Sequence, residues 1–395
     1  MQSMSREQQG TETRATSAII VGTADGAAFS LDQRARWRRA FARAGIADVR
    51  LETDSPPTEG TTVLVRADLI LEEVLTKALA ALPDTLLVIE HGGTKRPVAV
   101  HLTAARAAEG ARLIAGEQLE GEPDRLTVVN PIGLGSSYNH ALRKRAEPYA
   151  LLLNQMPLRT VEWRMFKGAY KGVTDFVTKW FWPWPAFWVT RWCAAARVTP
   201  NAVTAASLVM VLIALWLFAA GYFALGVIAA WFMTFLDTVD GKLARVTLTS
   251  SKWGNVFDHG IDLIHPPFWY FSWYYGIAAL GLESAWQVPA LWIIVLGYVL
   301  GRLQEGFFLW RFRVEIHAWR AIDSWFRLFT ARRNPNLAIM TVAVVAGHVD
   351  VGFLAVAVWT IASLAFHFMR IGQAIAMRAR GQPVQSWLMD GMRTA

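Results

Sequence analysis

The chain has 395 residues, of which 54% are hydrophobic and only 18% are charged. Because an average soluble domain is about 25% charged, this composition excludes a protein whose whole surface faces water. The formal net charge of +8 fits either nucleic acid or an anionic membrane surface. The basic residues cluster at the ends of apolar runs, so we favour the membrane and expect no nucleic-acid partner. The single cysteine, Cys193, excludes an internal disulfide.

The N-terminal half begins with a polar stretch, residues 1–16, which lacks the apolar core of a signal peptide and is predicted to be disordered. Apolar runs and helical patterns then alternate. The expected strands and helices are, in order, strands at 17–22, 61–66 and 85–90 and helices at 31–43 and 71–82. This alternation favours a soluble, cytosolic three-layer α/β domain with a mainly parallel sheet, which we place at residues 17–157.

The loop after the first predicted strand carries no Lys or Arg between Val21 and Arg34. A loop without cations would bind a triphosphate poorly, because phosphate oxygens need positive partners or charged donors. We therefore expect this domain to be catalytically silent. Asp68, which follows the strand at 61–66, has two interpretations: a metal ligand, or the cap of the next helix.

Residues 158–198 are predicted to form a juxtamembrane linker that ends in a helix lying in the membrane interface. Tryptophans, phenylalanines and cations alternate from Lys179 to Arg197, which is typical of interfacial helices. Pro183 and Pro185 are expected to interrupt this helix. The alternative is a soluble amphipathic linker, which would leave many tryptophans in water.

Apolar runs after Thr199 predict six membrane-spanning helices. The run at 202–236 is too long for one span of about 20 residues, so we expect it to cross the membrane twice with a turn at Gly221. The other expected spans are 256–280, 288–310, 337–346 and 351–369. Lys and Arg mark the cytoplasmic side, and the loops expected outside, around Gly221, 281–287 and 347–352, contain neither. The sequence therefore predicts a multi-pass protein of the cell (inner) membrane with both termini in the cytoplasm.

The six-helix domain is placed at residues 199–380, followed by a cytoplasmic tail at 381–395. Within it, residues 315–333 combine aromatic and basic side chains. We expect this segment to lie on the cytoplasmic surface with Trp319, Trp325 and Phe329 facing lipid.

Four aspartates lie where apolar sequence meets a short basic segment: Asp237, Asp240, Asp258 and Asp262. Residues three or four positions apart share one face of a helix, so each pair points one way. If the first pair ends one helix and the second begins the next, all four carboxylates can meet in one pocket. Such carboxylates are costly beside lipid unless positive charge holds them, and an all-oxygen cluster suits Mg2+ or Mn2+. The alternative is two amphipathic helix ends with solvated acids.

Small residues accompany the aspartates. Gly241, Ala244 and Gly254 remove side-chain bulk and would let a nucleotide approach the backbone. With the aspartates they complete the pattern D-x2-D-G-x2-A-R-x8-G-x3-D-x3-D over residues 237–262. This pattern is identified as the signature of the CDP-alcohol phosphatidyltransferase family, and every position of it is filled. The resemblance covers roughly the second half of the chain, from about residue 171.

The resemblance implies a membrane enzyme of phospholipid or phosphodiester-alcohol biosynthesis that moves a phosphoalcohol group from a CDP-alcohol to a hydroxyl acceptor and releases CMP. It implies two Mg2+ or Mn2+ ions held by Asp237, Asp240, Asp258 and Asp262, with Asp262 also acting as the general base. It further implies a nucleotide site formed by Asp237, Gly241, Ala244, Arg245 and Gly254. The expected surrounding is the lipid bilayer, and one option for the assembly is a homodimer.

The donor is expected to be CDP-diacylglycerol. The N-terminal domain resembles a degenerate nucleotidyltransferase domain, as in di-myo-inositol-phosphate-phosphate synthases, which makes inositol phosphate a candidate acceptor beside glycerol phosphate, serine and choline. Arg302 lies within an apolar run, where a charge is costly and usually functional. We expect it to bind an anionic group of the acceptor together with Arg332 or Arg333; alternatively, Arg302 only pairs with Glu305. A second class of function, a metal-dependent membrane binding or transport protein, would release no CMP.

Overall fold

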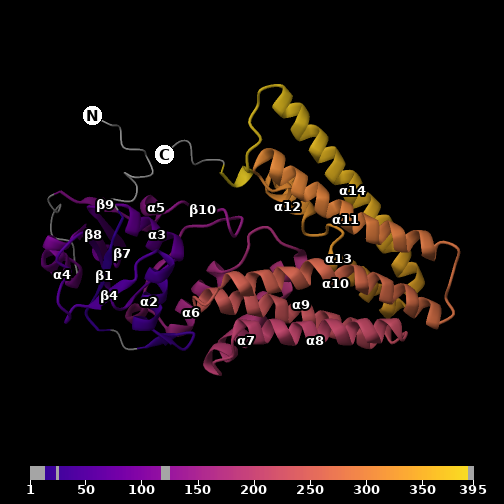
Figure 1. Ribbon diagram of the computed structural model, residues 1–395, viewed down its shortest axis with the longest axis horizontal. Coiled ribbons are helices and arrows are strands. Elements are labelled where there is room, and N and C mark those ends of the chain that lie inside the picture. The colour runs from indigo at the N-terminus through magenta and orange to yellow at the C-terminus, as the bar shows by residue number, and fades with distance from the viewer. Residues whose placement is uncertain (1–13, 24–25, 117–124, 390–395) are drawn as a thin grey trace. The chain divides into compact units, whose positions relative to one another are not determined.

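The computed structural model describes residues 14–23, 26–116 and 125–389, so most of the predicted disordered stretch at 1–16 lies outside the described residues. The chain divides into two compact units. The first comprises residues 1–139, 145–170 and 245–249, and the second comprises 140–144, 171–244 and 250–395. Figure 1 shows an α/β region in the N-terminal part and a helical region in the C-terminal part.

A six-stranded sheet forms the centre of the first unit, in the order β4-β1-β5-β8-β7-β9. The strands are β1 (Ser17–Val21), β4 (Asp48–Leu51), β5 (Thr61–Arg66), β7 (Thr85–His91), β8 (Thr94–Thr103) and β9 (Thr127–Val129). β1 runs parallel to β4 and β5, and β7 runs parallel to β9. β8, which the sequence analysis did not predict, is antiparallel to β5 and β7. The sheet is therefore mixed, because β8 joins two parallel sets.

Helices cover both faces of this sheet (Figure 1). Successive strand residues point to opposite faces, so Ile20 packs with Trp37 in one apolar cluster whereas Leu64 packs with Ile114 in another. The first face is covered by α2 (Gln33–Arg43) and α3 (Glu73–Ala81), and the second by α4 (Ala107–Ala115). The predicted three-layer arrangement is confirmed.

Short elements complete the N-terminal region. They are β2 (Ala27–Ala28), β3 (Leu31–Asp32), β6 (Leu69–Leu71), η1 (Ala104–Arg106), α5 (Pro131–Leu134), β10 (Tyr138–Asn139), β11 (Lys144–Arg145), β12 (Ala150–Leu152), η2 (Leu153–Gln155) and α6 (Leu158–Gly168). β12 pairs antiparallel with β6.

The second unit is helical. Its elements are η3 (Val177–Phe181), α7 (Pro183–Ala195), α8 (Pro200–Ala219), α9 (Phe223–Val246), α10 (Lys252–Ala279), α11 (Gln287–Phe312), η4 (Ile316–Ala318), α12 (Ala321–Phe326), α13 (Arg333–Ala346), α14 (Val349–Ala379) and η5 (Trp387–Met389). Large buried side chains such as Phe218, Trp273 and Phe353 form a continuous core among the long helices. Phe218 comes from α8, Trp273 from α10 and Phe353 from α14.

Four of the helices in the described part of the chain are long and apolar enough to cross a membrane: α8, α9, α11 and α14. They correspond to the first, second, fourth and sixth predicted spans. α10 contains the third predicted span and α13 the fifth, but neither is among these four. α13 has only 14 residues, about 21 Å at 1.5 Å per residue, which is shorter than a hydrocarbon core of about 30 Å. Six spans therefore stay a prediction.

Glycines end three of the long helices. Gly221, Gly281 and Gly347 have φ angles of 82°, 68° and 75°, a left-handed conformation that glycine adopts without steric cost. They lie between α8 and α9, between α10 and α11, and between α13 and α14. The turns that the sequence predicted at these places are present.

Two expectations about aromatic segments are wrong in detail. Pro183 and Pro185 begin α7 instead of interrupting it, because proline lacks the N–H that the first helical turn leaves unpaired anyway. Trp319 is 2% exposed and does not face lipid; its ring lies under the guanidinium groups of Arg320 and Arg370, at 4.5 and 4.4 Å. Trp325, like Phe329, is exposed as predicted.

Candidate functional site

The four aspartates of the sequence pattern lie on two consecutive helices. α9 carries Asp237 and Asp240 near its end, and α10 carries Asp258 and Asp262 near its start. Ser251 begins α10: its hydroxyl accepts a hydrogen bond from the Gly254 N–H at 3.0 Å, a common helix cap. The arrangement that the spacing predicted, one pair ending a helix and the other opening the next, is therefore present in the backbone.

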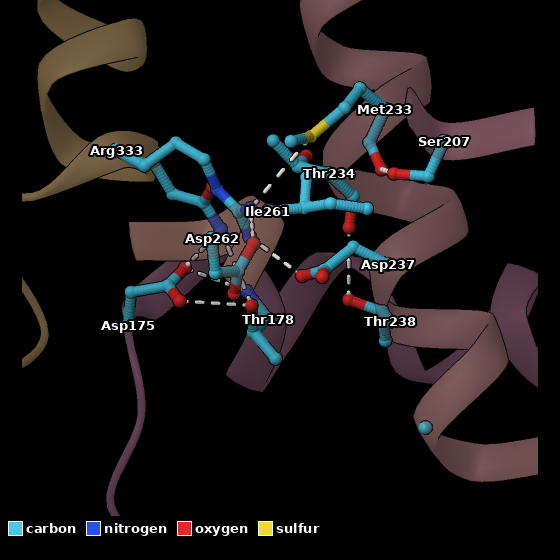
Figure 2. A network of polar contacts seen from close by, with 12 residues as sticks. Asp175, Thr178, Ser207, Met233, Thr234, Asp237, Thr238, Ile261, Asp262 and Arg333 are labelled. Atoms are coloured by element: carbon cyan, nitrogen blue, oxygen red, sulfur yellow. Dashed lines mark hydrogen bonds and ion pairs between the residues drawn. The ribbon is translucent and has the colours of Figure 1, made fainter. Parts of the chain in front are cut away.

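Arg333 joins the two helices at the aspartates (Figure 2). From the first turn of α13, its Nη2 donates to Asp237 Oδ2 at 2.6 Å and its Nη1 donates to Asp262 Oδ1. Arg333 and Asp237 are mostly buried, whereas Asp262 is about half-buried. A charge taken out of water needs a paired partner, and this guanidinium supplies one to both carboxylates. Arg333, predicted as an acceptor contact, thus lies among the predicted metal ligands.

Asp240 is held from a different helix. The Thr204 hydroxyl of α8 donates to Asp240 Oδ2 at 2.5 Å, and the Gly241 N–H donates to Oδ1. Both Asp240 and Thr204 are buried. Sequence reasoning missed Thr204, although a hydroxyl one turn inside an apolar helix was a signal that a polar partner lies nearby.

The side chain of Asp258 lies outside the described residues. Among the residues that are described, no three His, Cys, Asp or Glu side chains converge as a group that could hold a metal ion. The acidic side chains that meet here, Asp237 and Asp262, offer carboxylate oxygens as metal ligands. Oxygen ligands of this kind suit a hard divalent cation.

The predicted nucleotide residues lie on the same two helices as the aspartates. Gly241, Ala244 and Arg245 belong to α9, and Arg245 Nη1 donates to the Ala169 carbonyl at 3.1 Å. A Cβ atom at Gly254 would lie 3.0 Å from Asn201 Oδ1 and 3.1 Å from Ser251 Oγ, so a larger residue would crowd these two side chains.

A second polar site lies between α11, the segment before α13, and α14. It is a small cavity lined by Gly297, Tyr298, Gly301, Arg302, Glu305, Thr330, Ala331, Arg332, Thr360, Ser363, Leu364 and His367. Glu305 pairs with Arg302 at 3.4 Å and also with Arg332. The pairing of Arg302 with Glu305, left open by the sequence, is thus observed, and both predicted arginines, Arg302 and Arg332, line the cavity.

Several buried side-chain nitrogens at and near this cavity have no hydrogen-bond partner among the described residues. They are both ring nitrogens of His367 and Nε and Nη1 of Arg327. His317 lies 3.2 Å from Glu305, and burial lowers the pKa of His317 to about 3, so its ring is neutral. Burial lowers the pKa of Arg327 to about 9. The unpaired guanidinium nitrogens favour an anionic or strongly polar occupant.

The cavity and the aspartates are directly connected. Arg332 lines the cavity while the next residue, Arg333, binds Asp237 and Asp262. Tyr298 of α11 also lines the cavity, and its hydroxyl donates at 2.9 Å to the carbonyl of Leu263, which follows Asp262. A molecule in the cavity would therefore lie beside the aspartate site.

The histidines that flank the second acid pair bond within their own helix. His259 Nδ1 lies 3.0 Å from the Asn255 carbonyl, and His265 Nδ1 lies 2.7 Å from the Ile261 carbonyl. In the first unit, Asp68 does not cap the next helix: it pairs with Arg66 at 3.0 Å, and Glu72 occupies the cap position of α3.

Comparison with known proteins agrees with the sequence pattern. Residues 197–368 match the family model described as CDP-alcohol phosphatidyltransferase. Among solved structures, the apo crystal structure of Mycobacterium tuberculosis phosphatidylinositol phosphate synthase is 19% identical, with 47% of this chain and 94% of that chain covered and a TM-score of 0.37. A search of the curated proteins gives no match.

Proposed function

The chain contains a domain of the CDP-alcohol phosphatidyltransferase family at residues 197–368 and is a phosphotransferase, and from this premise we propose its reaction. It transfers a phosphatidyl-type group from a CDP-alcohol to a hydroxyl acceptor in the membrane, depends on divalent metal and releases CMP. The main observation behind the proposal is that Asp237 and Asp262, which lie on two consecutive helices, bind the same guanidinium, that of Arg333.

Asp237, Asp240, Asp258 and Asp262 would hold two Mg2+ or Mn2+ ions, as their all-oxygen donor set allows. Bound there, the metal would neutralise the diphosphate and stabilise the charge that develops on departing CMP. Asp262 acts as the general base: it is the more exposed of the two carboxylates that Arg333 contacts, so an acceptor hydroxyl can approach it. A base must be ionised and within hydrogen-bond reach of the proton it takes.

The nucleotide lies along the end of α9 and the start of α10. Asp237, Gly241, Ala244, Arg245 and Gly254 form this site in our proposal, because the small residues leave room for close approach to the backbone. The tight contact of the Gly254 position with Asn201 supports a need for small side chains there.

The acceptor occupies the cavity at Arg302 and Arg332. Because Glu305 offsets only one of the two arginines and His317 is neutral, an anionic group would balance the charge. Arg333 lies between the acceptor and the aspartates. Inositol phosphate is the acceptor that we favour; glycerol phosphate, serine and choline are the alternatives.

The donor in this proposal is CDP-diacylglycerol. Long apolar helices such as α8 and α14 support a lipid surrounding, and we place the protein in the cell (inner) membrane with both termini in the cytoplasm.

The experiment is to incubate membranes that contain the full-length chain with CDP-diacylglycerol, Mn2+ and one acceptor at a time. Mass spectrometry then identifies the lipid formed, and CMP is measured in the same sample. We expect a new phospholipid with one acceptor and an equal amount of CMP. Metal binding without CMP from any acceptor would instead indicate a binding or transport protein.

A further inference from the structure

A buried carboxylate outside the sequence pattern lies beside the aspartate site (Figure 2). Asp175 is 6% exposed and precedes the π-helical turn η3. Asp175 Oδ1 accepts from the Thr178 N–H at 3.0 Å, and Oδ2 accepts from the Thr178 hydroxyl at 2.9 Å. These bonds begin the turn.

A third contact of Asp175 reaches towards α13. Asn334 Nδ2 donates to Asp175 Oδ1 at 3.1 Å, and Asn334 is 5% exposed. On its other side, Asn334 Oδ1 accepts from Arg333 Nε at 3.3 Å. A carboxylate can only accept hydrogen bonds, so Asp175 binds the amide nitrogen of Asn334. The amide oxygen of Asn334 is thereby directed towards the Arg333 guanidinium. Asn334 thus connects Asp175 with Arg333 in one fixed orientation.

The same guanidinium binds Asp237 and Asp262 through its two Nη atoms. Its three nitrogens are therefore directed at three separate acceptors, and the planar fork of an arginine cannot turn without losing one of them. Resting on the function proposed above, we propose that Asp175 is a positioning residue: through Asn334 it holds the Arg333 guanidinium against the general base Asp262 and against Asp237.

One oxygen of Asp175 makes the contact with α13, because Oδ1 accepts both from the Thr178 N–H and from Asn334 Nδ2. In Asp175→Asn the amide oxygen can take the place of Oδ1, and the NH2 group can donate to the Thr178 hydroxyl. The orientation of Asn334 and Arg333 is then kept. In Asp175→Ala the acceptor is lost, so the Asn334 amide can turn and Arg333 is no longer held.

A cycle of alanine variants separates the interaction between the two sites from the effects of each site. If Asp175 acts through Asn334, the Asp175→Ala, Asn334→Ala double variant should be no worse than the more damaging single variant. Asp175→Asn is the conservative variant that keeps the acceptor.

The test measures kcat and KM per folded enzyme for the full-length chain with CDP-diacylglycerol and the acceptor found above. We expect Asp175→Ala and Asn334→Ala each to lower kcat by about tenfold or more, the effect of losing one hydrogen bond to a charged group. The KM for the CDP-alcohol should change little, because Arg333 orients the base and not the nucleotide. Asp175→Asn should keep kcat within about threefold of the unaltered chain, and the double alanine variant should lower kcat no further than the more damaging single variant.

The matched control is Asp323→Ala. Asp323 is also a buried carboxylate of the second unit that accepts from a backbone N–H, at 2.9 Å from Arg320, and it pairs with Arg370. Its replacement should lower thermal stability while kcat per folded enzyme is kept. Should Asp175→Ala fail to fold, Asn334→Ala, which leaves the Thr178 contacts of Asp175 intact, should show the same loss of kcat.

Two results would overturn the inference: a kcat for Asp175→Ala close to that of the unaltered chain, or losses of kcat in the two alanine variants that multiply in the double variant. An unaltered chain that releases no CMP with any acceptor would instead refute the proposed function, and this inference with it. The two failures are therefore distinguishable.

Discussion

Arg302 and Arg333 show how two arginines of one domain can serve different purposes. Arg333 bonds to the carboxylates themselves, whereas Arg302 faces a cavity and shares Glu305 with Arg332. An arginine inside apolar sequence costs roughly 2.5–3.5 kcal/mol on insertion scales. The single negative charge of Glu305 offsets only one of the two arginines, Arg302 and Arg332. We therefore propose that an anionic group of the acceptor offsets the other.

Replacing Arg302 with alanine should therefore weaken acceptor binding. The expected loss is about 1.5–3 kcal/mol, or roughly a 10- to 100-fold rise in KM for an anionic acceptor, with little change for the donor. The control is Arg311→Ala, an exposed arginine at the end of the same helix. A defect confined to the CDP-alcohol, or no defect, would mean that Arg302 serves only its pair with Glu305.

His101 gives the first unit a pH dependence. It is buried in β8, with Nδ1 2.9 Å from the Leu79 carbonyl and Nε2 2.9 Å from Thr61 Oγ1. Burial lowers the pKa of His101 below its ordinary value of about 6.5. Below that pH the unfolded chain takes up a proton that the folded state resists, so the free energy of unfolding falls as the pH falls.

The measurement is thermal unfolding of the full-length protein in detergent near pH 7.5 and near pH 5.5. The first unit should unfold at a lower temperature in acid, and His101→Gln should reduce the difference between the two conditions. An equal acid effect in the variant would assign the pH dependence to other groups.

At the scale of elements, close contact between α8 and α10 depends on a glycine. A Cβ atom at Gly276 of α10 would overlap the backbone carbonyl of Phe218 in α8. Gly276→Ala should therefore force the helices apart and cost about 1–3 kcal/mol of stability. Gly372→Ala in α14 is the matched control, since no atom lies within 4 Å of its added Cβ. If both variants unfold at the same temperature in detergent, the two helices do not need this contact.

The elements that local pattern determines were predicted well. β1, β5 and β7 follow apolar runs, and the aspartate pairs lie on successive helices because their spacing is a local property. β8 was missed: its first residues are Thr94, Lys95 and Arg96, and Pro97 argues against a strand. The adjacent glycines at 92 and 93 were a usable signal, because two such residues between strands are typical of a hairpin.

Long-range partners could not be read from the sequence. Arg333 is 71 residues from Asp262 and 96 from Asp237, and Asp175 is 159 residues from Asn334. No periodicity links positions so far apart, because tertiary packing brings them together. The sequence identified Arg333 as functional but assigned it to the acceptor alone, and it gave no sign of Asp175.

At the scale of the whole molecule, we predict that the first unit does not bind a triphosphate. The backbone N–H of Gly22, which follows β1, donates to the Glu52 carboxylate at 2.8 Å. A bound phosphate would need backbone N–H groups of this kind, and here one of them is already bonded to a negatively charged side chain. We expect the full-length chain to make no pyrophosphate from CTP and a phosphorylated alcohol. The same preparation should release CMP from CDP-diacylglycerol, which controls for its activity. Pyrophosphate formation from CTP would show that the first unit is an active cytidylyltransferase.

The most direct test of the central claim is CMP release from CDP-diacylglycerol by the purified full-length chain and by Asp237→Asn. We predict that the unaltered chain releases CMP only with an acceptor and with Mg2+ or Mn2+, and that a chelator stops it. Asp237→Asn should stay in the membrane fraction but lose roughly a hundredfold or more in kcat, the effect of removing one group from a preorganised charged site. Undiminished CMP release from that variant, with an unchanged dependence on the cation, would contradict the account.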